Sequence, residues 1–86
     1  MKLIFCKECQ SVFSLSFSKK TCDCGKSWGR YMRDGLNAEY GGTVIPLGFA
    51  NASFIAALNN QQEEGMGKEF VAFVINRKCR TFHNRD

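Results

Sequence analysis

Residues 6–24 read "CKECQSVFSLSFSKKTCDC", and their four cysteines organise the first third of the chain. The array is C-x2-C, twelve intervening residues, then C-x-C, with Gly25 directly behind. A zinc ion takes four tetrahedral ligands, which proteins commonly deliver as two cysteine pairs on separate turns. The spacing therefore predicts one metal site made by four thiolates: Cys6, Cys9, Cys22 and Cys24.

The segment between the two pairs alternates apolar and polar residues. Phe13, Leu15 and Phe17 fall on one face of an extended chain, and serines separate them. This period of two predicts a strand with one buried side. The polar residues 18–20, "SKK", predict a turn that returns the chain to the second pair. A hairpin is thus expected between the two cysteine pairs.

Residues 3–33 resemble the zinc-ribbon superfamily and its rubredoxin-like knuckles. "CKEC" matches the usual knuckle spacing of the family, whereas "CDCG" is one residue shorter. The resemblance implies one structural zinc ion per chain. Iron held by the same four sulfurs, or a redox pair at "CKEC", are the alternatives. With "GRYMRDGLNAEYGG" and "IPLGFANASF", the chain also looks like small bacterial and phage ribbon proteins. For a phage protein, modulation of a host complex would be the natural role.

Residues 28–48 predict three short strands separated by glycine turns. The expected strands cover 28–33, 36–40 and 43–48, with "DG" at 34–35 and "GG" at 41–42 as hairpin signals. An expected helix then runs from Asn51 or Ser53, as caps, to Gly65. Its apolar face is expected to cover a sheet.

The apolar run 69–75, "EFVAFVI", predicts a central strand buried on both sides. The predicted core joins Phe54 and Leu58 of the helix to this strand, through Phe70, Phe73 or Val74. The fold class is therefore α+β, a ribbon hairpin merged with or packed on a small, mainly antiparallel sheet backed by one helix. One domain, 1–86, is expected: ribbon 3–33, sheet and helix 34–76, basic tail 77–86.

Five cysteines in 86 residues fit either a secreted disulfide scaffold or a metal protein of a reducing compartment. "MKLIFCKEC" reaches charged residues at once and contains no apolar signal region, and no window is long enough for a membrane span. A cytoplasmic protein without structural disulfides is therefore expected. Cys79 has no partner at ligand spacing except His83, so we predict a partly buried or free thiol.

Charge is uneven along the chain. Residues 1–33 hold seven Lys or Arg against two acids, whereas residues 34–76 hold one lysine against five acids. The cationic and aromatic residues after the second pair are a candidate partner surface: Lys26, Trp28, Arg30, Tyr31 and Arg33. In a strand Lys26, Trp28 and Arg30 share one face, and Tyr31 and Arg33 share the other. The alternative is a solvated face with Trp28 and Tyr31 partly in the core.

Enzyme signatures are scarce. The single histidine supports no triad, and neither "YGG" nor "GMG" matches a phosphate loop or a dinucleotide fingerprint. Four thiolates on one zinc ion also leave no position for a reactive water. We therefore expect no catalytic residue, no membrane and no small-molecule substrate. The favoured function is a non-enzymatic zinc protein that binds another protein, and the alternative is a nucleic-acid-binding regulator.

Overall fold

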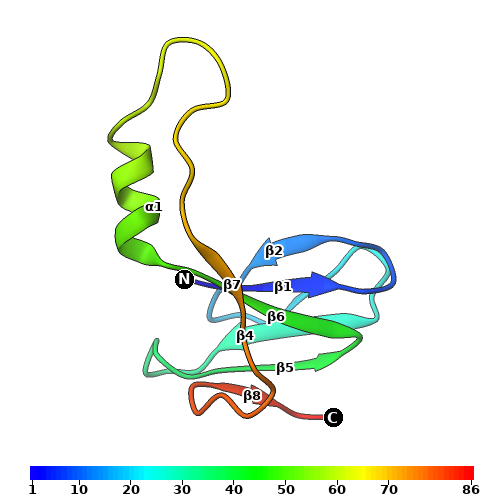
Figure 1. Cartoon of the computed structure of the whole chain (residues 1–86). Coiled ribbons are helices and arrows are strands. Elements are labelled where there is room, and N and C mark those ends of the chain that lie inside the picture. The colour runs from blue at the N-terminus through cyan, green and yellow to red at the C-terminus, as the bar shows by residue number, and fades with distance from the viewer.

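The computed structural model describes all residues, 1–86, as two four-stranded sheets and one helix (Figure 1). The first sheet has the order β2-β1-β6-β7, and the second has the order β3-β4-β5-β8. All neighbouring strands are antiparallel except β5 and β8. The bounds in the first sheet are β1 Lys2–Cys6, β2 Val12–Ser14, β6 Val44–Phe49 and β7 Ala72–Val74. Those in the second are β3 Lys20–Thr21, β4 Ser27–Tyr31, β5 Ala38–Gly42 and β8 Phe82–Asn84. The predicted α+β class is confirmed.

The hydrophobic core lies between the two sheets. Ile4 of β1 and Phe82 of β8 are completely buried, and the ring of Tyr40 meets the ring of Phe82 edge-on at 4.8 Å. Gly29 of β4 lies against this core, where an added Cβ would collide with the side chain of Ile4. The six core residues are Ile4, Leu15, Ala38, Tyr40, Val44 and Phe82.

The two predicted glycine turns have different outcomes. The "DG" turn is confirmed, because Tyr31 pairs with Ala38 across it and the carboxylate of Asp34 accepts backbone hydrogen bonds within it. The "GG" hairpin is wrong, because β5 and β6 belong to different sheets. The chain leaves one sheet for the other at Gly42, whose φ is 93° and whose missing Cβ would collide with the carbonyl oxygen of Lys26. Only glycine suits this backbone without strain.

The helix is shorter than predicted and does not cover a sheet. α1 spans Asn51–Leu58 and has no buried residue, and neither Asn51 nor Ser53 caps it through a side chain. α1 has only eight residues, and no helix of the protein combines the length and apolarity needed to cross a membrane. Its large side chains Ile55 and Leu58 remain exposed. Its one aromatic ring, Phe54, meets the ring of Phe49 at the end of β6 at 5.2 Å and the ring of Phe70 at 4.9 Å.

The prediction of a central strand at 69–75 is wrong. β7 covers only Ala72–Val74, lies at the edge of the first sheet and exposes all three residues. The predicted core is therefore also wrong, apart from the contact between Phe54 and Phe70: Leu58, Phe73 and Val74 are exposed. Residues 50–71, here called the arm, contain α1 and the segment that follows it, and they project from the two sheets (Figure 1).

Candidate metal centre

Each cysteine pair lies at the tip of its own hairpin. Cys6 ends β1 and Cys9 lies in the turn to β2, while Cys22 and Cys24 lie in the turn between β3 and β4. Each turn contains a residue with positive φ, Gln10 at 62° in the first and Gly25 at 77° in the second. The expected hairpin between the pairs is wrong, because β2 pairs with β1 and β3 pairs with β4. The two sheets therefore bring the pairs together from separate hairpins.

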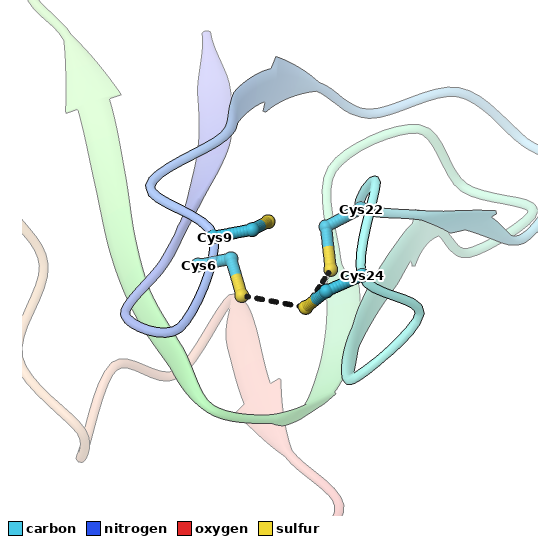
Figure 2. Close-up of side chains that lie close together, drawn as sticks. All are labelled: Cys6, Cys9, Cys22 and Cys24. Atoms are coloured by element: carbon cyan, nitrogen blue, oxygen red, sulfur yellow. Dashed lines mark hydrogen bonds between the residues drawn. The ribbon is translucent and has the colours of Figure 1, made fainter.

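The four sulfurs form one compact cluster, as the spacing predicted (Figure 2). All four Sγ atoms lie within 4.8 Å of one another. The distance is 3.7 Å from Cys6 to Cys24 and 3.4 Å from Cys22 to Cys24. Tetrahedral ligands at a zinc–sulfur distance of about 2.3 Å would be about 3.8 Å apart. The spacing of the sulfurs therefore fits a four-thiolate metal site.

Burial differs within each cysteine pair. Cys6 and Cys22, the first cysteine of each pair, are buried, whereas Cys9 is half-buried and Cys24 is exposed. The cluster is thus anchored in the body of the protein on one side and reaches the surface on the other. Sulfurs on all four corners would enclose a tetrahedral ion completely, which is the arrangement of a structural site.

Hydrogen-bond donors surround the sulfurs. The backbone N–H of Ser27 donates to Cys22 Sγ at 3.3 Å, and the hydroxyls of Thr43 and Ser11 lie 3.5 and 3.0 Å from the sulfurs of Cys6 and Cys9. Ser27 Oγ and Thr43 Oγ1 are 3.2 Å apart, so the two hydroxyls also form a hydrogen bond with each other. Donors of this kind orient ligands and stabilise their charge. The cysteine spacing in the sequence did not indicate that Ser11, Ser27 and Thr43 would lie beside the sulfurs.

The pKa values of Cys6, Cys9 and Cys24 are shifted from the usual value of a thiol. Backbone hydrogen bonding at Cys9, then hydroxyl contacts, lower the pKa of Cys6 to about 5, and the Ser11 hydroxyl lowers the pKa of Cys9. For Cys24 the Lys26 backbone N–H acts to lower the pKa, but the neighbouring thiols and desolvation outweigh it and raise the pKa to about 12. Four thiolates so close together repel one another. A bound dication removes that penalty, because it favours the deprotonated form of every ligand.

Cys79 and His83 lie apart from this cluster. The half-buried Cys79 thiol is 3.5 Å from the Thr81 hydroxyl and packs against the core. His83 of β8 is 3.3 Å from the side-chain oxygen of Asn37. The structure therefore agrees with the prediction that Cys79 is a partly buried free thiol.

The candidate partner surface divides between two faces of β4. Arg30 is exposed, whereas Trp28 and Tyr31 are both half-buried. The Tyr31 hydroxyl accepts a hydrogen bond from the Lys2 backbone N–H at 3.1 Å. Lys19 Nζ lies 4.7 Å from the centre of the Trp28 ring. Lys26 and Arg33 are exposed beyond the two ends of the strand. Within β4, Trp28 and Arg30 lie on the face opposite to Tyr31, as predicted, but Lys26 and Arg33 lie outside the strand. The role of this surface stays a prediction.

Glu39 is a buried carboxylate that the sequence analysis placed only within the expected strand 36–40. It lies in β5 and accepts hydrogen bonds from Arg85 at 2.8 Å and from Arg30 at 2.6 Å. These two guanidinium groups lower the pKa of Glu39, with Arg85 contributing more. Glu39 therefore ties the C-terminal residues to the second sheet.

Comparisons of the chain with protein-family models, with curated proteins and with solved structures found no match. The assignment of the metal centre therefore rests on its own geometry.

Proposed function

We propose that the chain is a small, non-enzymatic zinc protein that works by binding another protein in a reducing compartment such as the cytoplasm. The zinc ion is structural in this proposal. It would be held by Cys6, Cys9, Cys22 and Cys24, and it would fasten the β1–β2 hairpin of one sheet to the β3–β4 hairpin of the other.

The four thiolate ligands do not distinguish zinc from iron, so we favour zinc for its chemical properties. Both metals accept four thiolates in tetrahedral geometry. Zinc has no redox chemistry and suits a site whose role is to stabilise a small body of 86 residues. Elemental analysis and the absorption spectrum of protein purified with its native metal separate the two, since ferric thiolates absorb visible light and zinc thiolates do not.

The exposed apolar side chains carry the proposal that the partner is a protein. Large apolar residues of the arm and β7 are in contact with water, and among them Met66 is fully exposed and Val74 is 67% exposed. A concentration of this kind in a soluble protein marks an interaction surface. The other exposed members are Ile55, Leu58, Phe70, Val71 and Phe73.

Capture experiments test this function. Tagged, metal-loaded protein is used as bait, with and without nuclease, beside a variant with Ile55, Met66 and Val71 changed to Ser. We expect a protein partner that survives nuclease and is lost with the variant. A matched control changes Gln61, Gln62 and Asn60 to Ser, which are exposed polar positions of the same arm. Equal capture by both variants would count against the arm.

A second function, binding of nucleic acid, is supported by the cations around Trp28. Lys19 lies over the Trp28 ring, and Lys20 and Lys26 belong to the same hairpin and are exposed. Basic and aromatic side chains together can contact phosphates and stack bases. A base would however have to displace Lys19 from the ring, so we keep this function second.

A further inference from the structure

The molecule exposes more surface than a compact monomer of the same mass. Its accessible area is 6121 Å², whereas a compact monomer of 9.7 kDa would have about 5,100 Å². Its radius of gyration of 14.0 Å also exceeds the roughly 12 Å of a compact domain of this length. The projecting arm accounts for the elongated shape (Figure 1). The excess of about 1,000 Å² is slightly more than one side of a standard protein interface, about 800 Å².

The open edge of β7 borders this exposed region. The backbone N–H of Ile75 donates to the carbonyl of Pro46, and the carbonyl of Val71 accepts from the N–H of Ala50. The odd-numbered residues 71, 73 and 75 therefore direct their backbone groups toward β6. Ala72 and Val74 therefore direct their N–H and C=O groups away from β6, toward solvent. β7 contains no lysine, proline or bulge, which are the devices that usually protect an edge strand from pairing.

We propose that β7 pairs with β7 of a second copy of the chain, antiparallel about a two-fold axis centred on Phe73. In this register Ala72 of one copy forms a hydrogen-bonded pair with Val74 of the second copy, and the reverse pair forms by symmetry. Both members of each pair already direct their free backbone groups outward. The two first sheets would then join into one continuous sheet of eight strands.

In this register one oppositely charged pair flanks β7, and one like-charged pair lies beyond it. With Phe73 at the centre, Glu69 lies opposite Arg77 of the second copy, and the contact occurs twice by symmetry. Neither residue has an ion pair within its own chain, and both are exposed. Lys68 falls opposite Lys78 of the second copy, beyond the apolar stretch. A second copy therefore supplies a charge complementary to Glu69 and to Arg77.

This inference rests on the proposed function, because it names one protein that the exposed surface binds. The test is the mass of the metal-loaded full chain, measured by light scattering behind a sizing column over a dilution series. We expect twice the mass of one chain at high concentration. A single-chain mass up to about 100 µM, far above a micromolar dissociation constant, would overturn the proposal.

Three variants test the pairing itself. Ala72→Pro removes an outward N–H without removing a bond to β6, and we expect it to be monomeric with its metal retained. Glu69→Arg places an arginine opposite Arg77 of the second copy at both symmetric contacts. This repulsion should raise the dissociation constant of the dimer about tenfold. Adding Arg77→Glu to Glu69→Arg restores opposite charges and should restore the dimer. A merely structural role of Glu69 would give no such rescue.

Glu63→Arg is the matched control, because it makes the same charge change in the arm away from the register. It should leave the dissociation constant close to that of the natural chain. A dimer that withstands both Ala72→Pro and Glu69→Arg would reject pairing through β7. A monomeric protein that still captures another protein would reject self-pairing and leave the proposed function standing. A dimer that captures no other protein would support self-pairing and reject binding of a different partner.

Discussion

The Sγ atoms of Cys6 and Cys24 lie 3.7 Å apart, although the two residues are 18 positions apart in the sequence and belong to hairpins of different sheets. A metal ion bound at this point would link the two sheets. Cys24→Ala should therefore lose the metal and most of the folding free energy, since structural zinc can contribute about 10–16 kcal/mol in peptide systems. Metal content and thermal unfolding measure both effects. Cys79→Ala is the control, because Cys79 lies outside the cluster, and it should keep one metal ion per chain.

The core between the sheets should dominate stability. Ile4→Ala removes a completely buried side chain, so we expect a loss of about 2–5 kcal/mol in the free energy of unfolding. Leu58→Ala removes a side chain that is 45% exposed, so we expect a loss of less than about 1 kcal/mol. Denaturant unfolding of the metal-loaded proteins compares the two. Similar losses at both positions would mean that the arm packs on the body in solution.

Local patterns in the sequence predicted the cluster of four cysteines and several strands correctly. Paired spacing is a direct chemical requirement of a four-thiolate site, so it indicated which cysteines come together without knowledge of the topology. The "DG" turn was also predictable, because Asp34 and Gly35 satisfy the turn locally. In each case neighbouring residues decide the structure.

The arrangement of the sheets was not predictable in this way. The same glycine that permits a hairpin turn at "GG" also permits the change of sheet at Gly42, and only long-range pairing distinguishes them. Likewise, the apolar run at 69–75 is typical of a buried strand, yet this structure leaves β7 at an edge. An apolar segment is expected to be buried, but its composition does not show whether residues of the same chain or of a partner cover it.

Glu39 should make stability depend on pH. Its folded pKa is lowered, chiefly by Arg85 and then by Arg30, so its contribution is present above the unfolded value of about 4.3. The contribution is lost as the pH falls through the folded pKa. Glu39→Gln should therefore cost about 1–2 kcal/mol at pH 7, a modest value because both guanidinium groups are half exposed.

The check on Glu39 is a comparison of the two proteins at several pH values. The difference in unfolding free energy between Glu39→Gln and the natural chain should be constant from pH 7 to about 5 and shrink below about pH 4. Loss of metal in acid affects both proteins and cancels in the difference. A difference that stays unchanged at low pH would show that the carboxylate charge contributes nothing.

The last prediction concerns nucleic acid. We expect weak, non-specific binding at physiological salt, with dissociation constants near 10⁻⁴ to 10⁻⁶ M, because the cations of the β3–β4 hairpin are few and Arg30 is held by Glu39. If Lys26 and Arg30 did bind phosphates, replacing both would flatten the slope of log affinity against log salt by nearly two units on duplex. Trp28→Ala would then cost about 1–3 kcal/mol if a base stacks on the ring. Salt titrations of the three proteins on duplex and single strands measure these quantities. Submicromolar, sequence-dependent binding at physiological salt, lost in Trp28→Ala with the metal retained, would make nucleic-acid binding the leading function.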